Sequence, residues 1–268
     1  MQESIFYSLY KHKGLLFKLI QRDVAGRYRG SVMGGLWSLI TPVLMLLIYL
    51  FVFGVVFNAR RSGVEPGSGM ADFGLWLFAG MLVHGLFGEC LTRAPSAVVG
   101  QPSYVKKVIF PLEILPLVVV GSAFFHALVG VGVLLCGLCI VRGGISETVL
   151  WLPLVWLPLI LLCAGVTWLV AALAVYLRDI GQMTGLVATV LLFLSPIFFS
   201  ASSLPEHYRP LLELNPLTVP IEMSRSILLD GMAPVWGVLG MHSLMGVVVA
   251  WLGLATFQKL RPGFADVL

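Results

Sequence analysis

The chain has 268 residues, of which 59% are hydrophobic and 11% are charged, and its mean hydropathy is +0.97. Soluble domains average about 45–50% apolar and about 25% charged residues, so this composition excludes an ordinary water-soluble enzyme and a disordered chain. The formal net charge of +4 fits cytoplasmic membrane loops better than a nucleic-acid-binding surface. We therefore predict a membrane protein with no nucleic-acid partner.

Six apolar segments are long enough to cross a bilayer as helices, which takes about 20 residues each. Their runs are continuous and lack the alternation of a membrane β-barrel. We expect an all-α fold with six transmembrane helices at residues 36–57, 73–92, 114–140, 149–177, 180–201 and 235–257. A cytoplasmic N-terminal segment (1–35) precedes this six-span domain (36–257), and a cytoplasmic tail (258–268) follows it.

The basic residues predict the orientation of the spans. With the N-terminus inside, the cytoplasmic segments hold 12 Lys and Arg residues and the external segments hold 5. This bias favours cytoplasmic placement of both termini. The first 35 residues have no long apolar core, so we expect no cleavable signal sequence and treat the first apolar run as a true span.

Residues 5–20 have the periodicity of an amphipathic helix. Four apolar and three basic side chains fall on opposite faces: Ile5, Leu9, Leu16 and Ile20 against Lys11, Lys18 and Arg22. One interpretation is a helix lying in the cytoplasmic membrane interface, and the alternative is a loose basic tail. The cytoplasmic loop 93–113 is long for a connector, so it is either a short helix that presses on a partner or a solvated basic loop.

The outer segment 202–234 contains five prolines but is too apolar for a free loop. Short re-entrant helices covered by protein would satisfy both facts, because irregular backbone is tolerated at membrane depth only when it is covered. A folded external cap is the alternative interpretation.

Several chemical signatures are absent from the sequence. There is no phosphate-binding G-x-x-x-x-G-K-[ST] loop, so the chain is not expected to hydrolyse ATP by that route, and the H-E-x-x-H and G-x-S-x-G signatures are also missing. Cys136 and Cys139 form a C-x-x-C without a second pair at zinc spacing, so we predict no metal site and no catalytic residues.

Four ionisable residues inside the spans have structural interpretations. His84, His126 and His242 have no acidic neighbour in sequence and are interpreted as packing residues. Glu89 precedes Arg93 by four residues, the spacing of an ion pair on one helical face. A proton relay would need more acidic groups, so any uphill transport must draw its energy from a partner.

Several strings in this order resemble the type-2 ABC transporter permeases, and more narrowly their polysaccharide-export branch of O-antigen, capsule and teichoic-acid exporters. The strings are RDVAGRYRGSVMGGLW (22–37) with Pro42, KKVIFPLEILP (106–116), RDIGQ (178–182), SPI (195–197), LPE (204–206), NPL (215–217) and Arg225. Taken together, these strings most resemble those of O-antigen exporter permeases. Leu112 stands where the family has a charged residue, a small departure.

This resemblance implies a bacterial inner-membrane permease that dimerises and binds two copies of a separate ABC ATPase subunit. ATP and Mg would bind at that ATPase, and this chain would bind no cofactor. The first and fifth spans of both copies would line a channel for a lipid-linked glycan, while the N-terminal helix and the loop after the second span would engage the ATPase.

The candidate site residues fall into four groups. Those for substrate recruitment at the headgroup level are Arg22, Arg27, Tyr28 and Arg29, whose alternative role is ordinary anchoring of the first span. Those for coupling to the ATPase are Lys11, Lys18, Tyr104, Lys106 and Lys107. Those for the channel are Tyr49 and Phe53, four residues apart on one face, and Phe198, whereas Phe51 points elsewhere. Those for the outer gate are Pro205, Asn215 and Pro216.

The leading functional prediction is ATP-driven export of a lipid-linked, O-antigen-like polysaccharide. Alternatives are a type-2 permease for capsule polysaccharide, teichoic acid, a drug or a small lipid. A membrane enzyme such as a glycan polymerase is a third class, but the outer segments offer no convincing acid–base pair.

Overall fold

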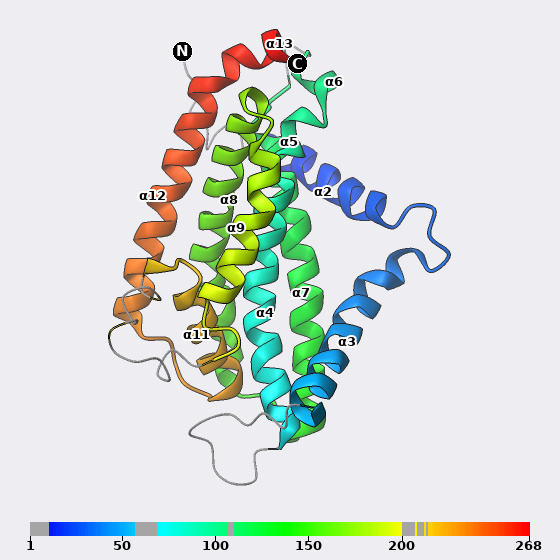
Figure 1. Ribbon diagram of the computed structural model, residues 1–268, viewed down its shortest axis with the longest axis vertical. Helices are drawn as coiled ribbons and strands as arrows, with labels where there is room; N and C mark the ends of the chain where they lie inside the picture. The colour runs from blue at the N-terminus through cyan, green and yellow to red at the C-terminus, as the bar shows by residue number, and fades with distance from the viewer. Residues whose placement is uncertain (1–10, 57–68, 107–109, 200–206, 208–211, 213) are drawn as a thin grey trace.

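The computed structural model describes residues 11–56, 69–106, 110–199, 207, 212 and 214–268. Every regular element in these residues is a helix (Figure 1). The all-α fold is therefore confirmed, and its physical basis is that helices satisfy their own backbone hydrogen bonds, as lipid requires. Within the described ranges, five helices are long and apolar enough to cross a membrane.

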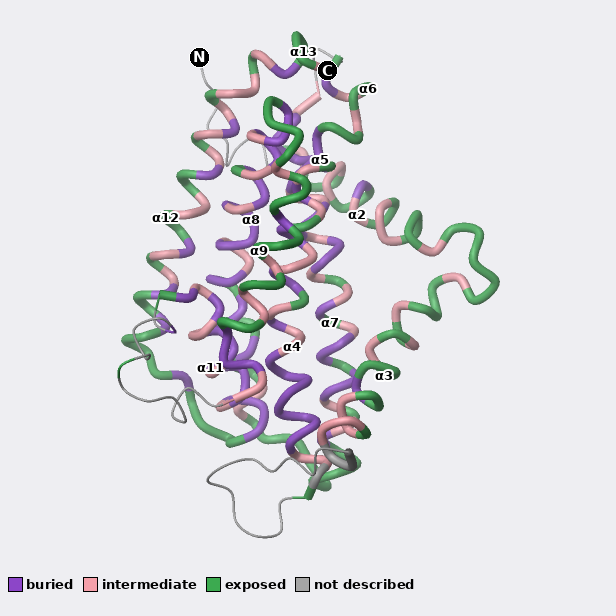
Figure 2. Tube along the Cα trace, viewed as in Figure 1, coloured by how far each residue is buried: buried purple, intermediate pink, exposed green. Residues whose placement is uncertain are grey.

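Four long helices form the bundle. They are α4 (Met70–Arg93), α7 (Ile114–Arg142), α8 (Leu152–Tyr176) and α12 (Trp236–Leu260). Figure 2 shows buried residues concentrated on α4, α7 and α8, while much of α12 is exposed. The core of the molecule is therefore the region where α4 packs between α7 and α8.

The helices α8 and α12 cross closely because glycines lie at their contact. A Cβ atom on Gly253 would lie 2.0 Å from the Gly165 carbonyl oxygen, and one on Gly165 would lie 2.4 Å from the Val249 carbonyl oxygen. Small residues that let two backbones approach are the usual means of helix packing in lipid. These two glycines fix the position of α12 against the bundle.

The first apolar segment lies at the edge of the bundle. It consists of the 3₁₀ turn η1 (Gly34–Leu36), the helix α3 (Trp37–Tyr49) and the π-helix η2 (Leu50–Val56). Leu46 is the one buried residue of α3, and the helix diverges from the bundle in Figure 1. This segment therefore exposes a long apolar face.

The fifth apolar segment forms a shorter helix than the sequence predicts. We expected it to extend to residue 201, but α9 (Ile180–Leu194) ends after 15 residues. Ser195 is extended, with φ −92° and ψ 151°, because a residue before proline is pushed out of the helical region and Pro196 follows. The apolar run is real, but proline geometry ends its helix early.

One end of the bundle, the upper end in Figure 1, carries the short helices. They are α2 (Lys13–Arg27), α5 (Ser96–Val99), α6 (Pro102–Val105), η6 (Arg261–Gly263) and α13 (Phe264–Val267). Where the sequence predicts an amphipathic helix over residues 5–20, the structure has a helix from Lys13 to Arg27, and residues 5–10 lie outside the described part. The loop 93–113 contains short helices, as one of its two interpretations predicts.

The opposite, lower end carries the turn η3 (Glu147–Trp151) and the helix α11 (Thr218–Leu229). Eight of the 12 residues of α11 are buried, and the helix packs on α4 and α8. In Figure 1 it lies alongside the lower part of the bundle. The predicted outer segment thus contains a short, largely buried helix within its described residues.

Candidate functional site

The helix α2 packs across the bundle near its upper end. Leu19 is buried, and a Cβ atom on Gly121 of α7 would lie 2.3 Å from the Ile20 Cδ1 atom. The apolar side of α2 therefore fits a groove that glycine opens on α7. The next turns of α2 bring Arg22, Asp23 and Arg27 to the rim of a pocket.

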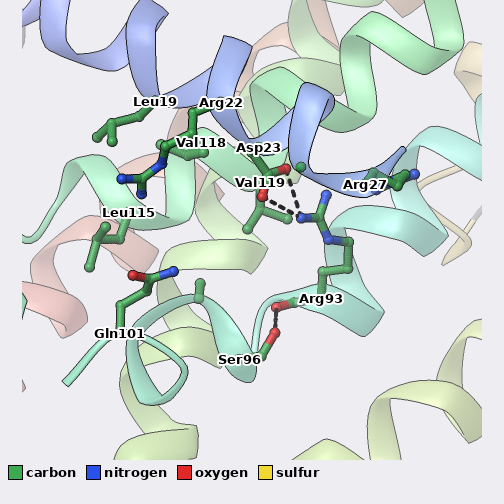
Figure 3. A pocket seen from close by; sticks show the side chains of 12 residues that line it. Leu19, Arg22, Asp23, Arg27, Arg93, Ser96, Gln101, Leu115, Val118 and Val119 are labelled. Carbon is green, nitrogen blue, oxygen red and sulfur yellow. Dashed lines mark hydrogen bonds and ion pairs between the residues drawn. The ribbon is translucent and has the colours of Figure 1, made fainter. Parts of the chain in front are cut away.

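This pocket has a volume of about 630 Å³ and lies between α2, the end of α4, α5 and the start of α7 (Figure 3). Its lining is half polar and half apolar: Leu19, Arg22, Asp23, Gly26, Arg27, Arg93, Ser96, Ala97, Gln101, Leu115, Val118 and Val119. Such a volume lies within the range of small-molecule sites. The pocket is therefore large enough for a headgroup-sized ligand, and two of the predicted recruitment residues line it.

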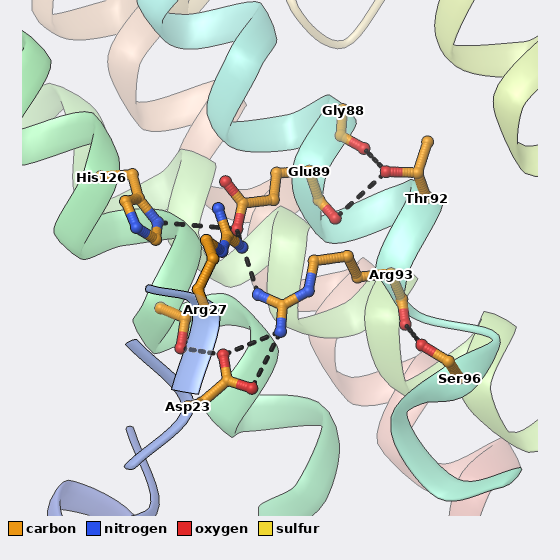
Figure 4. A network of polar contacts seen from close by, with 9 residues as sticks. Asp23, Arg27, Gly88, Glu89, Thr92, Arg93, Ser96 and His126 are labelled. Carbon is orange, nitrogen blue, oxygen red and sulfur yellow. Dashed lines mark hydrogen bonds and ion pairs between the residues drawn. The ribbon is translucent and has the colours of Figure 1, made fainter. Parts of the chain in front are cut away.

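An ion-pair network forms one wall of the pocket (Figure 4). Arg93 Nη2 donates to both carboxylate oxygens of Asp23, at 2.9 and 2.8 Å, and the Ser122 hydroxyl donates to Asp23 Oδ2 at 2.5 Å. Arg93 also pairs with Glu89 at 3.1 Å, which confirms the ion pair predicted from their spacing. The network thereby ties α2 to both α4 and α7.

Glu89 has two further partners that the sequence did not reveal. Arg27 of α2 donates to its carboxylate, and His126 Nδ1 of α7 lies 3.7 Å from Glu89 Oε1. His126 thus has an acidic neighbour in space although it has none in sequence. The Tyr28 ring lies 6.0 Å from that of His126, and burial raises the pKa of the Tyr28 phenol, an effect that the adjacent Arg27 charge opposes.

Arg22 links the predicted recruitment and coupling residues. Its Nη1 donates to the Tyr104 hydroxyl at 2.9 Å, and its guanidinium lies 5.8 Å from the centre of that ring. Tyr104 of α6 in turn stacks on Phe110 at 4.5 Å between centroids. Two groups that the sequence treats separately therefore meet at one contact between α2 and α6.

The other predicted recruitment and coupling residues lie outside this contact. Arg29, Lys11, Lys18 and Lys106 are exposed. Lys107 lies outside the described residues, as does Pro205 of the predicted outer gate.

The predicted channel aromatics pack against α4. The ring centroids of Tyr49 and Phe78 are 6.3 Å apart, and Phe53 lies 6.1 Å from Phe73. Phe198 also meets Phe53, at 6.0 Å. By contrast Phe51 is 60% exposed, so the prediction that it points away from Tyr49 and Phe53 is confirmed. Whether these rings line a channel stays a prediction.

At the lower end, Asn215 closes the last turn of α9. Its side-chain amide donates to the Leu194 carbonyl at 3.1 Å and to the Ser195 hydroxyl at 2.9 Å. Its own carbonyl accepts from the Leu217 backbone N–H at 2.9 Å. Asn215 is buried and Pro216 is half-buried. Of the predicted gate residues, Asn215 therefore joins α9 directly to the segment before α11.

Arg225 of α11 is a buried residue that joins several segments by hydrogen bonds, and it was not among the predicted site residues. It is 1% exposed, its Nε donates to the Trp76 carbonyl at 3.0 Å, and its Nη2 donates to the Ile197 carbonyl at 2.8 Å. A further bond reaches the Pro196 carbonyl. The guanidinium lies 3.4 Å from the centre of the Trp76 indole ring, and Gly80 leaves the room, since a Cβ there would lie 2.5 Å from Nη2. An arginine in an apolar helix was the sequence signal for this role.

The four cysteines differ in their exposure to the surroundings of the protein. Cys136 and Cys139 are exposed, whereas Cys90 and Cys163 are buried. In the part of the chain that the structure describes, no three His, Cys, Asp or Glu residues gather closely enough to hold a metal ion.

The fold and these sites define a polytopic helical membrane protein, with several short helices at one end and the largely buried helix α11 at the other. Residues 14–229 match the ABC-2 type transporter family. The chain therefore belongs to that family, and the resemblance identified in the sequence is confirmed.

Similar proteins cover nearly the whole chain. An O-antigen export system permease protein RfbA from Myxococcus xanthus is 28% identical over 261 residues, 96% of each chain. A protein of the same name from Klebsiella pneumoniae is 25% identical over 255 residues, 95% of each chain. The polysialic acid transport protein KpsM from Escherichia coli is 24% identical over 245 residues, 90% of this chain and 91% of its own.

Proposed function

We propose that this chain is the membrane-spanning permease of an ATP-driven exporter that moves a lipid-linked, O-antigen-like polysaccharide across the bacterial inner membrane. The observation that carries the proposal is family membership over residues 14–229 together with the near full-length match to O-antigen export permeases. Capsule polysaccharide is the second candidate, because the polysialic acid transport protein matches 90% of this chain.

The proposed assembly has two copies of this chain and two copies of a separate ABC ATPase. The exposed apolar residues of α3 and α9 support a seam between copies, since a second chain would cover them: Leu44, Leu47, Ile48, Leu186, Val190 and Phe193. The ATPase docks at the upper end, on the cytoplasmic side, where α2 and Lys106, which follows α6, expose basic side chains. Both termini then lie in the cytoplasm.

The proposed path of the substrate begins at the pocket beside α2. Arg22, Arg27, Tyr28 and Arg29 recruit the pyrophosphate of the lipid carrier, because arginine forks bind phosphate oxygens in pairs. The glycan then passes Tyr49, Phe53 and Phe198. The segment with Pro205, Asn215 and Pro216 closes the outer end, and movement of the ATPase reaches α2 through the bond between Arg22 and Tyr104.

Deletion of the gene followed by glycolipid analysis tests this function. We expect polymer to disappear from the cell surface and finished, lipid-linked polymer to accumulate on the inner leaflet, with recovery when the gene is supplied on a plasmid. Unfinished or shortened chains on the lipid carrier would instead indicate a polymerase. Unchanged glycans with altered drug sensitivity or lipid composition would favour a drug or lipid exporter.

A further inference from the structure

The pocket beside α2 contains one cation that the ion-pair network does not use. Arg93 is held by Asp23 and Glu89, and Arg27 is held by Glu89. Arg22 pairs with no carboxylate among the residues that the structure describes; its contacts are the Tyr104 hydroxyl and ring. A neutral phenol does not compensate a guanidinium charge, so Arg22 can still pair with an anion.

The polar side of the pocket surrounds that cation with further donors. In Figure 3 the guanidinium of Arg22 and the amide of Gln101 lie toward the same side of the pocket, and the Asp23–Arg93 pair lies toward the other. The lining has three arginines and one carboxylate, and Glu89 behind it balances one more positive charge. The pocket therefore keeps an excess positive charge next to Arg22.

The remaining lining is apolar and continuous with the bundle. Leu19 of α2 faces Leu115, Val118 and Val119 of α7 across the same pocket. A ligand that fits both sides has a compact anionic group joined to a hydrocarbon chain. Lipid headgroups combine these features, and an interfacial helix such as α2 lies at their depth in the membrane.

We propose that this pocket binds the phosphate group of a membrane lipid, with Arg22 as its principal cation and Gln101 as a neutral donor. The inference deepens the proposed function and rests on it for the lipid-linked substrate, whose carrier is a polyprenyl pyrophosphate. An anionic phospholipid carries the same phosphate chemistry, so the experiment treats the two lipids separately.

Binding is measured by native mass spectrometry on the full chain purified in detergent, titrated with one lipid at a time. The probes are polyprenyl pyrophosphate, phosphatidylglycerol, and diacylglycerol as the lipid with matching tails and no phosphate. We expect the phosphate-bearing lipids to bind and Arg22→Gln to weaken their binding about tenfold, the size of one charged hydrogen bond. Arg178→Gln removes the same charge from an exposed residue outside the lining, and it should change binding less than twofold.

Equal losses in Arg22→Gln and Arg178→Gln would overturn the proposal, because the attraction would then be general surface charge. Equal binding of diacylglycerol would also overturn it, because the pocket would then recognise the tails. If Arg22→Gln fails to fold, as judged by its melting temperature, Gln101→Ala carries the test and should weaken binding by a smaller factor.

The two lipids separate this inference from the proposed function. Arg22-dependent binding of phosphatidylglycerol alone supports a phosphate pocket and contradicts recruitment of the substrate through it. Arg22-dependent binding of polyprenyl pyrophosphate supports both, and it is measured without any export. Export lost in the deletion strain, with no lipid binding at Arg22, would leave the proposed function standing and overturn the pocket.

Discussion

Arg225 shows how one residue can hold the lower end of the bundle in Figure 1 together. Its guanidinium donates hydrogen bonds to three backbone carbonyls. Two of these, on Pro196 and Ile197, follow the end of α9 and therefore have no helical N–H donor. A buried carbonyl without a donor costs about 1–3 kcal/mol. The arginine thus makes the early end of α9 stable beside α4 and α11.

Replacement of Arg225 tests how much this residue contributes to the stability of the fold. We expect Arg225→Met, which keeps most of the volume and removes all donors, to lower the free energy of unfolding by roughly 2–4 kcal/mol. The measurement is denaturant or thermal unfolding of the purified chain in detergent. Arg178→Met is the matched control, because Arg178 is exposed at the upper end. Equal melting temperatures for the two variants would contradict the role given to Arg225.

Among the helices, α6 is the proposed coupling element, because Tyr104 joins it to α2 through Arg22. We expect alanine at both Tyr104 and Lys107 to leave membrane insertion and ATP hydrolysis intact while export falls several-fold. Tyr104→Phe keeps the stacking on Phe110 and removes only the hydroxyl, so its loss should be smaller. ATPase activity and surface glycan are measured in parallel, and full export by the double variant at normal protein levels would refute the assignment.

The first apolar segment, α3 with η2, makes a prediction about the channel. Tyr49 and Phe53 pack on α4, whereas Phe51 faces away. In a background without the four native cysteines, single cysteines at 49 and 53 should react with a water-soluble thiol reagent only during ATP turnover, when the path is open. A cysteine at 51 is the control. Labelling at 51 while 49 and 53 stay inert would place the path on another face.

Across the whole molecule, α4 connects the two ends. Glu89 and Arg93 near its last turn hold the network with α2 and α7, and Trp76 near its first turns holds Arg225 of α11. A rigid helix of 24 residues thus touches both the proposed cytoplasmic and the proposed outer machinery. A displacement of α4 would therefore shift its contact residues at both ends of the bundle.

The proposed dimer also belongs to the whole molecule. We expect the purified chain to have twice the 29.2 kDa mass of one copy, measured by light scattering in detergent. Leu47→Trp on α3 and Leu186→Trp on α9 should shift it toward monomer, because an oversized side chain separates a packed seam. Leu244→Trp, on the equally exposed face of α12, should not. A dimer indifferent to all three would place the seam elsewhere.

The sequence by itself determined the features that depend on near neighbours in the chain. Apolar runs of about 20 residues predict helices because lipid leaves the backbone few alternatives. The Glu89–Arg93 pair follows from four-residue spacing, and a helix near the N-terminus follows from the apolar periodicity there. The sequence also contains Pro196, which disfavours a helical conformation at Ser195. We nevertheless extended the fifth helix past it, because we set the helix boundary by the length of the apolar run.

Only the tertiary structure decided which distant residues meet. Arg27 reaches Glu89 across 62 positions, Arg22 reaches Tyr104 across 82, and Arg225 reaches Trp76 across 149. No local pattern encodes these contacts, because they depend on how helix faces turn toward one another and on where glycines such as Gly80 and Gly121 leave room. Packing therefore created the pocket beside α2 and the buried Arg225 cluster at the opposite end of the bundle from residues that look unrelated in the chain.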